Sequence, residues 1–103
     1  MSLTVQGHAG TAPHGQDLVC AAATMLCYTM AQNAIEMRKA GWLEEDPVIK
    51  LVHGEGDVIF RPKEDHKEQA ALCMQTIMTG YDVLANTYPD AVRVHYIGNS
   101  PED

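Results

Sequence analysis

A cysteine and a histidine twelve residues apart are the residues of this sequence best suited to nucleophilic chemistry. Cys20 is expected in or just after the first turn of a helix, where backbone N–H groups and the helix dipole favour the thiolate, the reactive form of cysteine. His8 follows a predicted strand and can fold back over that turn, and a histidine within hydrogen-bond reach of a cysteine activates it. The N–H groups of the helix start could also hold an oxyanion. The pair therefore predicts covalent catalysis with Cys20 as nucleophile and His8 as base.

Less reactive roles remain open for the same residues on their chemistry alone. A cysteine in an apolar helix, the predicted setting of Cys20, is usually a packed core residue. His14 is a rival base, although its place beside Gly15 also suits a residue that lines a cleft. A metal site formed by His8, His14 and Cys20 has neither the spacing of usual zinc sites nor a clear fourth ligand. We therefore expect no metal and no cofactor.

The residues between His8 and Cys20 are predicted to form a glycine-bearing loop that leads into the helix. Gly10 and Gly15 allow tight turns and a close approach of the backbone, so the loop could order over a bound peptide. Asp17 suits the N-cap or the first turn of the helix, one turn before Cys20. We interpret Asp17 as a capping residue rather than as a direct participant in catalysis.

Hydrophobic periodicity and turn residues predict six elements in the order β-α-β-β-α-β. The predicted strands cover residues 3–6, 48–53, 58–61 and 92–96, and the predicted helices cover residues 17–40 and 64–87. Gly41 suits the position just past the end of the first helix. In the second helix, apolar residues recur at alternating spacings of four and three from Ala70 to Tyr88. The most economical packing is a two-layer α+β fold with two helices on one face of a mostly antiparallel sheet, as a single domain over residues 1–103.

The composition bounds the kinds of partner that the chain can bind. It has 14 acidic and 7 basic residues among 103, a formal net charge of -7. This acidity argues against nucleic acid and against an anionic membrane surface, and it suits a basic partner.

We find no apolar run near the ~20 residues that a membrane helix needs, so no membrane contact is expected. Three cysteines without a secretion signal indicate free thiols in a reducing compartment, hence the cytoplasm, with Cys27 and Cys73 in the core.

The early half of the first predicted helix has hardly any polar side chains. From Leu18 to Met30, only Thr24 and Thr29 are polar. A helix that is apolar on nearly all sides is buried on more than one face. One face would pack on the sheet, and another would pack on the second helix or on a partner subunit. A homodimer is therefore a reasonable hypothesis.

The motif around the cysteine resembles that of a known family. Gly7-His8-Ala9, Gly15 and the run Asp17-Leu18-Val19-Cys20-Ala21-Ala22 are similar to the signature of the ribosomal-processing cysteine proteases, called Prp. The resemblance covers nearly the whole chain, and it implies that Cys20 is the nucleophile and His8 the base. Asp17 matches the family's acidic residue at the helix start, and Thr24 keeps a hydroxyl where family members often have serine. The resemblance also implies removal of the N-terminal extension of a bacterial large-subunit ribosomal protein.

A noncatalytic module is the alternative hypothesis. Family members usually begin with an additional strand and turn, whereas only six residues precede Gly7 here. A chain of the same fold with a different N-terminus could be a ribosome-associated or phage-related binding or assembly module. Such a module would tolerate the loss of Cys20, whereas a peptidase would not.

Overall fold

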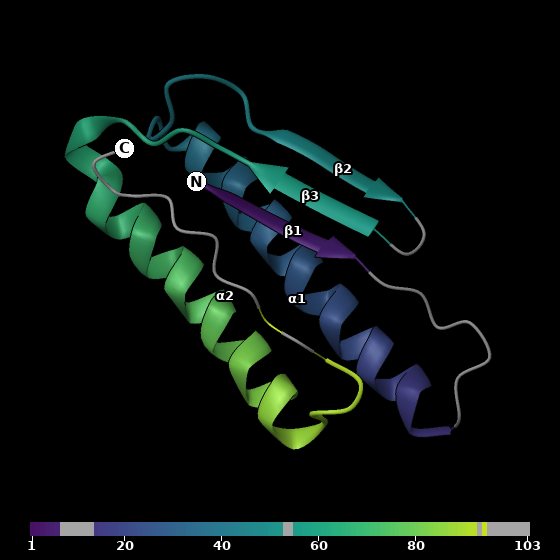
Figure 1. Cartoon of the computed structure of the whole chain (residues 1–103). Coiled ribbons are helices and arrows are strands. Elements are labelled where there is room, and N and C mark those ends of the chain that lie inside the picture. Colours follow the sequence, from purple (N-terminus) through teal and green to yellow (C-terminus); the bar gives the residue numbers. More distant parts are fainter. Residues whose placement is uncertain (7–13, 53–54, 93, 95–103) are drawn as a thin grey trace.

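Three antiparallel strands and two long helices make up the part of the chain that the structure, a computed structural model, describes (Figure 1). The described residues are 1–6, 14–52, 55–92 and 94. In chain order the elements are β1 (Ser2–Gln6), α1 (His14–Lys39), β2 (Val48–Val52), β3 (Glu55–Ile59), the short 3-10 helix η1 (Glu64–His66) and α2 (Lys67–Thr87). The α+β class predicted from the sequence is confirmed.

The central strand of the sheet is β3, which pairs antiparallel with β1 on one side and with β2 on the other. Because successive side chains of a strand point to opposite faces, Leu3 of β1 and Ile49 of β2 share a face with their common partner Val58 of β3. Leu3 and Val58 are buried, whereas Ile59, which points to the other face, is exposed. The sheet therefore has one face in the core and one face outside it.

The core forms where α1 meets the sheet and the second helix. α1 contacts β1, β3 and α2, and α2 runs antiparallel to α1 alongside it (Figure 1). Met30 and Ala34 of α1, Val58 of β3 and Ala70 of α2 are fully buried in one cluster. Burial of such side chains supplies most of the favourable free energy of folding, at about 25 cal/mol per Å² of apolar surface. α1 is therefore the helix that contacts both the sheet, through β1 and β3, and α2.

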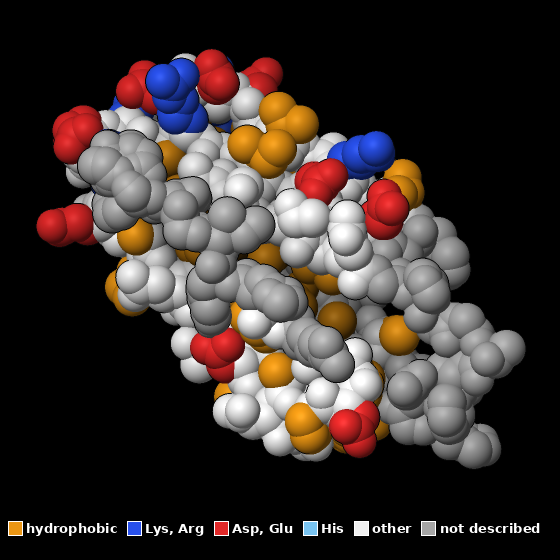
Figure 2. Space-filling view, in the orientation of Figure 1, with side chains coloured by type: hydrophobic (Ala, Val, Ile, Leu, Met, Phe, Trp, Pro, Cys, Tyr) orange, Lys and Arg blue, Asp and Glu red, His pale blue; other side chains and the backbone are white. Residues whose placement is uncertain are grey.

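Charged side chains gather at the end of the molecule where α1 ends and η1 lies (Figure 2). Arg38 forms an ion pair with Asp46 at 2.7 Å, and Lys67 forms one with Glu64 at 3.2 Å. All four side chains are largely exposed, and exposed pairs of this kind contribute at most about 1 kcal/mol each. The apolar core, rather than these ion pairs, therefore holds the helices against the sheet.

The spacing of apolar residues in α2 predicted its buried face correctly. Ala70, Ile77 and Tyr81 are buried, and Met74 packs against the core. Tyr88, the last position of the pattern, is the C-cap residue of α2 and is exposed. The periodic pattern therefore describes the core-facing side of α2 up to its last turn.

The C-terminal end of α1 is set by local sequence, as predicted. Gly41 has φ 82°, a left-handed conformation that costs glycine little. The N–H of Trp42 donates to the carbonyl oxygen of Met37 at 2.9 Å, and that of Gly41 donates to the carbonyl oxygen of Arg38 at 3.1 Å. These two bonds satisfy carbonyl groups that a helix end otherwise leaves unpaired. Gly41 therefore ends α1 at the predicted place.

The hairpin of β2 and β3 differs from its prediction. The predicted turn at 54–57 is wrong, because β3 begins at Glu55, which is paired with Val52. Gly56 is thus a strand residue, and it is buried. A Cβ atom at this position would lie 2.7 Å from Sγ of Cys27, so only glycine fits between β3 and α1 without a shift. Long-range packing, rather than turn chemistry, accounts for this glycine.

Two further predicted boundaries need correction. α1 begins at His14, whereas the sequence placed residues up to Gln16 in a loop. The predicted last strand at 92–96 is not seen at Val92 and Val94, which lie in no strand, and its other residues lie outside the described part of the chain. The order of the described elements is therefore β-α-β-β-α, with η1 before α2.

α1 is also more apolar than expected from the sequence. Among the described helices, its segment Leu18–Lys39 is the one that is long and apolar enough to cross a membrane by length and composition, so the expectation that no such run exists is wrong. Core helices of soluble proteins pass the same criterion, and 28% of the apolar window is buried within the structure. Met30 and Ala34 on the core-facing side account for part of this apolar character. The solvent-facing side of α1 is apolar as well.

Candidate active site

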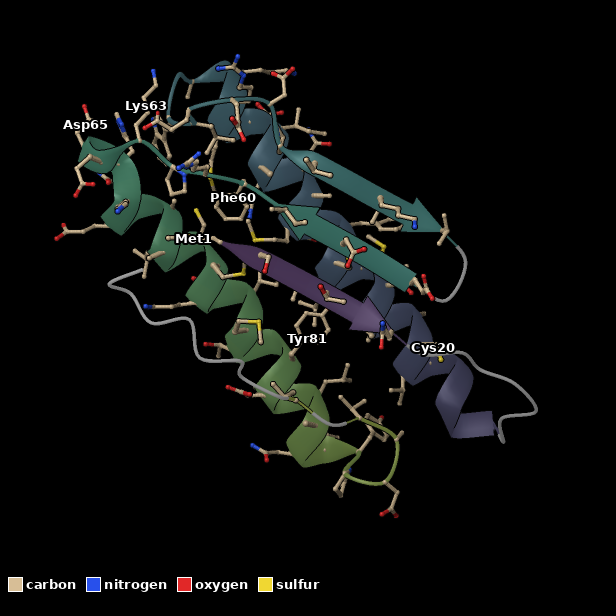
Figure 3. All side chains as sticks on the ribbon, turned by 45° about the horizontal axis from the view of Figure 1, so that its top comes forward. Met1, Cys20, Phe60, Lys63, Asp65 and Tyr81 are labelled. Carbon is tan, nitrogen blue, oxygen red and sulfur yellow. The ribbon has the colours of Figure 1, made fainter. Side chains whose placement is uncertain are left out.

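Cys20 lies at the boundary between the core and the surface. It is the seventh residue of α1, its side chain is half-buried, and Figure 3 shows it near the end of β1. Cys27 is seven residues further, so both side chains leave the helix in nearly the same direction, about 10 Å apart along the axis. The thiol of Cys27 lies against Gly56 of β3. Cys20 therefore faces the sheet side of α1, two turns nearer the N-terminus of the helix.

The start of α1 is further from Cys20 than the sequence predicted. Only the first four N–H groups of a helix lack an intrahelical acceptor, and in α1 these belong to residues 14–17. With a rise of about 1.5 Å per residue, they lie about 4.5 to 9 Å from Cys20 along the axis. Cys20 is thus in the second turn, where the dipole of the helix start has largely fallen off. Cys20 therefore lies in the turn that follows the first, and the helix starts three residues earlier than the predicted Asp17.

The five predicted site residues that precede Cys20 fall into two groups. His8 and Gly10 lie outside the described residues, so the structure does not test their distance from Cys20. For His14, Gly15 and Asp17 the backbone is described, and it forms the first turn of α1. The loop that was expected to contain Gly15 is therefore helical there, while Asp17 lies one turn before Cys20 as predicted.

Thr24 is the last of the predicted site residues. It is exposed on α1 and lies four residues after Cys20. Residues four apart are neighbours on one face of a helix. The hydroxyl of Thr24 is therefore accessible beside the thiol, on the side that leads towards the middle of the helix.

A hydrogen bond from α2 fixes the turn of α1 that follows Cys20. The hydroxyl of Tyr81 donates to the carbonyl oxygen of Ala23 at 2.8 Å, and Ala23 is three residues after Cys20. Burial is the main cause that raises the pKa of Tyr81, with the neighbouring Cys27 thiol as a further cause, so the hydroxyl stays a donor. The spacing of apolar residues in α2 predicted only that Tyr81 lies in the core. The missed signal is the polar end of a buried tyrosine, which usually finds a partner.

Of the remaining thiols, Cys27 is a core residue, as predicted, whereas Cys73 is only half-buried. Cys27 is buried, and desolvation raises its pKa, with the carboxylate of Asp57 adding to the shift. A protonated, buried thiol is a poor nucleophile. Cys73 packs against the core cluster from α2. Over the described residues, no group of three or more histidine, cysteine, aspartate or glutamate side chains could hold a metal ion.

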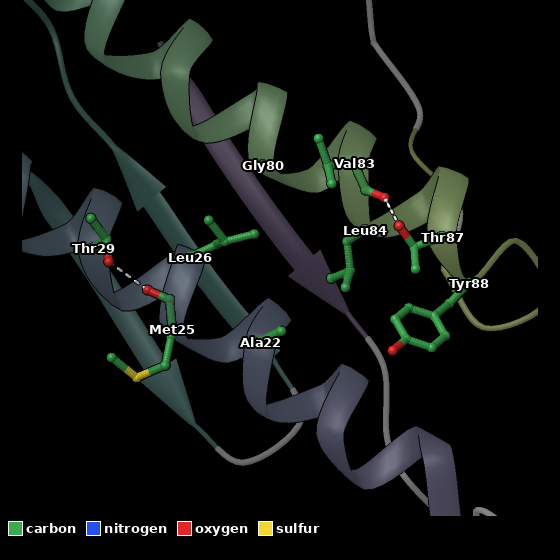
Figure 4. Close-up of a pocket in the computed structure, with 9 residues that line it drawn as sticks. All are labelled: Ala22, Met25, Leu26, Thr29, Gly80, Val83, Leu84, Thr87 and Tyr88. Carbon is green, nitrogen blue, oxygen red and sulfur yellow. Dashed lines mark hydrogen bonds between the residues drawn. The ribbon is translucent and has the colours of Figure 1, made fainter.

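A groove between α1 and α2 opens on the side of the helices away from the sheet (Figure 4). It has a volume of about 480 Å³, and nine residues of the two helices line it: Ala22, Met25, Leu26, Thr29, Gly80, Val83, Leu84, Thr87 and Tyr88. Ala22 is two residues after Cys20, and two positions in a helix differ in direction by about 200°. The groove is therefore on the opposite side of α1 from the thiol.

Comparison with known proteins identifies the family. The family model described as "Cysteine protease Prp" matches residues 1–93. The chain is 27% identical over 92 residues to the Ribosomal processing cysteine protease Prp of Staphylococcus aureus (strain NCTC 8325 / PS 47), covering 89% of this chain and 82% of the relative. It is 28% identical over 98 residues to the protein of the same name from Bacillus subtilis (strain 168), covering 91% and 83%. Because the family model spans most of the sequence, including Cys20, the chain belongs to the cysteine protease Prp family and is an enzyme of the cysteine protease class.

Proposed function

We propose that this chain is a cysteine endopeptidase that removes the N-terminal extension of a bacterial large-subunit ribosomal protein, with Cys20 as nucleophile and His8 as base. The observation that carries the proposal is the match of the protease family across residues 1–93, with Cys20 half-buried at the edge of the core while Cys27 is buried. A nucleophile must be reachable by its substrate, and a half-buried thiol meets this condition. The names of the relatives supply the class of substrate.

The connection of β1 supports the pairing of His8 with Cys20. β1 ends at Gln6, and Figure 3 shows that end near Cys20. His8 follows the end of β1 by two residues, which span at most about 7 Å, and β1 packs against the helix that carries Cys20. His14 is the rival base, and it lies in the first turn of α1.

The reaction would proceed through an acyl-enzyme. His8 takes the proton of the Cys20 thiol, and the sulfur attacks the carbonyl carbon of the scissile peptide. When the tetrahedral intermediate collapses, the C–N bond breaks and His8 gives the proton to the leaving amine. Water, deprotonated by His8, then attacks the thioester and releases the second product with its carboxyl group, which restores the thiol.

Charge and family support the remaining assignments. A net charge of -7 favours the approach of a basic extension from a ribosomal protein. An enzyme that acts on a ribosomal protein would work in the cytoplasm. Gly10, Gly15 and His14 would line the substrate cleft. Asp17 and Thr24 flank Cys20 by one turn on either side and would support its orientation. Because α1 is apolar on both its core-facing and its solvent-facing sides, we also propose a homodimer as the working form.

Mass spectrometry of a mixture with the extended N-terminus of the ribosomal protein tests the proposal. We expect a single cleavage, lost completely in Cys20→Ala and retained in the matched variant Cys73→Ala, which changes a thiol of α2. His8→Ala should abolish cleavage, whereas His14→Ala should reduce it by less than tenfold. If His14→Ala lost all cleavage and His8→Ala kept it, His14 rather than His8 would be the base. Cleavage by Cys20→Ala would contradict the proposal.

The position of Cys20 in the second turn of α1 favours a second candidate, a binding or assembly module without peptidase activity. The unpaired N–H groups of residues 14–17 lie a turn before Cys20, so they are less directly placed to hold an oxyanion than the first turn would be. Such a module would bind the extended ribosomal protein through other residues, so the thiol itself would contribute nothing to the affinity. Equal affinity of the wild-type chain and Cys20→Ala, with no cleavage by either, would favour the module.

A further inference from the structure

The strand β2 forms one outer edge of the sheet and is apolar along most of its length. The strand order is β1-β3-β2, so among the described residues no strand pairs with the outer side of β2. Four of its five residues are apolar, and Val48, Leu51 and Val52 are 58%, 38% and 50% exposed. Soluble proteins usually protect such an edge with charges, proline or a covering element, because its unpaired backbone groups can pair with another strand.

The hydrogen bonds at the start of β1 show which way the backbone groups of β3 point. The N-terminal ammonium of Met1 donates to the carbonyl oxygen of Phe60, and the N–H of Phe60 donates to the carbonyl oxygen of Met1, both at 2.9 Å. Successive residues of a strand direct their N–H and C=O groups to opposite sides. Every second residue of β3, counted back from Phe60, therefore faces β1, and the residues between them face β2.

Two residues of β2 consequently keep free backbone groups. By register, the residues of β3 that face β2 lie opposite Val48, Lys50 and Val52. The N–H and C=O groups of Ile49 and Leu51 therefore point to the outer edge, away from β3. These two residues are separated by about 6.8 Å, the repeat at which a partner strand exchanges hydrogen bonds. They offer their backbone groups to an added strand.

Side chains on both faces of β2 would contact such a strand. The helix α1 contacts the sheet mainly through β3 and β1. Leu51 points to the same face of the sheet as the core, yet it is largely exposed because α1 does not cover it fully. Val48 and Val52 point to the other face. An added strand would therefore bury apolar surface on both of its own faces.

Acidic residues lie around this edge. Residues 44–57 include five acidic residues against one lysine. Glu44 and Glu45, just before β2, and Glu55, in β3, are exposed. The lysine, Lys50, lies opposite Asp57 of β3. Charge complementarity therefore favours a peptide with apolar residues along the edge and lysine or arginine at the ends of the paired segment.

We infer that the outer edge of β2 binds the substrate as an added strand, in which an extended segment of the basic N-terminal extension pairs its backbone with Ile49 and Leu51. The inference rests on the proposed peptidase function and assigns the surface that holds the substrate. Strand addition takes its affinity from main-chain hydrogen bonds and its selectivity from alternate side chains. The edge of β2 offers free backbone groups and apolar side chains together.

The edge lies within reach of Cys20 for a bound peptide. β1 and β2 both run antiparallel to β3, and their last residues, Gln6 and Val52, lie opposite the same residue, Glu55. Figure 3 shows Cys20 near this end of β1. Strands are about 4.8 Å apart, so a strand added to β2 is about 14 Å from β1, a distance that four or five extended residues span. The scissile bond would therefore lie a few residues beyond the paired segment.

The other outer strand, β1, is less suited to this role. Its free edge lies towards α2, whereas the free edge of β2 points away from α2 (Figure 1). A peptide can therefore reach β2 without displacing a helix. A second copy of the chain would bring its own net charge of -7 to an acidic edge. A basic peptide is thus the favoured occupant.

N-methylation of the peptide tests the inference, because an added strand pairs with β2 through every second N–H group. A fluorescein-labelled synthetic peptide of the N-terminal extension is titrated with the inactive variant Cys20→Ala, and binding is followed by fluorescence anisotropy. We expect N-methyl groups at alternate positions of the paired segment to weaken binding about tenfold, and those at the positions between to weaken it less than about threefold. Equal effects at all positions, or no binding of the unmodified peptide, would overturn the inference.

Two substitutions at one position separate the backbone of β2 from its side chain. Leu51→Pro removes an N–H that points outward, and proline is tolerated on edge strands at such positions. Leu51→Ala shortens the side chain and keeps the N–H. In the Cys20→Ala background we expect peptide binding about tenfold weaker for Leu51→Pro and less than about threefold weaker for Leu51→Ala, with the same circular dichroism. Equal weakening would contradict the inference, and the peptide series decides the question even if Leu51→Pro does not fold.

Cleavage measured beside binding separates the inference from the proposed function. Cleavage of the extension with an unchanged KM in Leu51→Pro would overturn the role of the edge and leave the peptidase intact. Alternating effects of N-methylation without any cleavage by the wild-type chain would support the edge and contradict the peptidase. Sedimentation velocity tests a second copy as the occupant: a dimer that dissociates in Leu51→Pro but not in Leu51→Ala would also overturn the inference.

Discussion

The hydroxyl of Tyr81 donates a hydrogen bond of 2.8 Å to the carbonyl oxygen of Ala23, and it thereby joins α2 to the turn of α1 that follows Cys20. The two residues are 58 positions apart in the chain. Tyr81 is buried and its raised pKa keeps the hydroxyl protonated, so the bond persists over the ordinary pH range. This contact fixes the rotation and the position of α1 relative to α2 directly beside the proposed nucleophile.

Tyr81→Phe removes this hydrogen bond and leaves the ring in place. We expect a loss of about 1 kcal/mol in the free energy of unfolding, measured by urea denaturation, because a typical intramolecular hydrogen bond contributes that much. Tyr28→Phe in α1 is the control, since Tyr28 is largely exposed, and it should change stability by less than about 0.5 kcal/mol. Equal effects of the two substitutions would show that the Tyr81 hydroxyl does not stabilise the fold.

Gly56→Ala adds a methyl group where β3 lies against α1. The new Cβ would be 2.7 Å from Sγ of Cys27, so either the strand or the helix must shift. Overpacking of this kind costs about 1 to 3 kcal/mol. In the double variant with Cys27→Ala the blocking sulfur is gone, and the cost of Gly56→Ala should fall by at least half. A double-mutant cycle measured by thermal or urea unfolding gives this coupling directly, and additive effects would contradict the contact.

Alkaline pH should destabilise the fold through Cys27 and Tyr81. Burial raises the pKa of the Cys27 thiol above its ordinary 9.0 and that of the Tyr81 hydroxyl above its ordinary 10.0. Above pH 9 the unfolded chain therefore binds fewer protons than the folded chain, and stability falls as the pH rises. Below pH 9, the two protonated groups make their full contribution to the free energy of unfolding. In Cys27→Ala the decrease between pH 9 and 10 should be smaller than in the wild-type chain, and an identical decrease would exclude this thiol as a cause.

Alkylation should distinguish the three thiols at neutral pH. Cys27 is buried with a raised pKa, whereas Cys20 and Cys73 are each partly accessible. We expect iodoacetamide to modify Cys27 at least tenfold more slowly than Cys20, as followed by peptide mass spectrometry. Cys73 serves as the internal comparison, because it is half-buried like Cys20. Modification of Cys20 no faster than Cys73 would argue against an activated nucleophile.

Removal of the imidazole of His66 should lower the stability of the region where the segment after α1 packs on η1. The rings of Trp42 and His66 stack with their centroids 5.0 Å apart, so the segment after α1 packs on η1. Aromatic pairs contribute about 0.5 to 1.5 kcal/mol beyond area burial. His66→Ala should therefore lower stability within this range and shift the fluorescence maximum of Trp42, the one tryptophan of the chain, to longer wavelength. Peptidase activity should be unchanged, since this contact is at the opposite end of α1 from Cys20.

Local sequence alone determined several features of this protein. Gly41 ends α1 because a left-handed residue is required there and glycine adopts it at little cost. The spacing of Ala70, Ile77 and Tyr81 predicted the buried face of α2, since a helix repeats every 3.6 residues whatever it packs against. The motif around Cys20 indicated the protease family, which the family comparison confirmed.

Only the tertiary structure decided the features that depend on contacts between distant residues. Gly56 was predicted in a turn and is a buried strand residue, because its neighbour is Cys27 of α1. The start of α1 at His14 moved Cys20 into the second turn. The bond from Tyr81 to α1 and the groove between the helices exist because α2 packs alongside α1. Residue types and periodicity specify which face of an element is apolar, but register, close approach and long-range hydrogen bonds arise only when the packed elements are fixed in space.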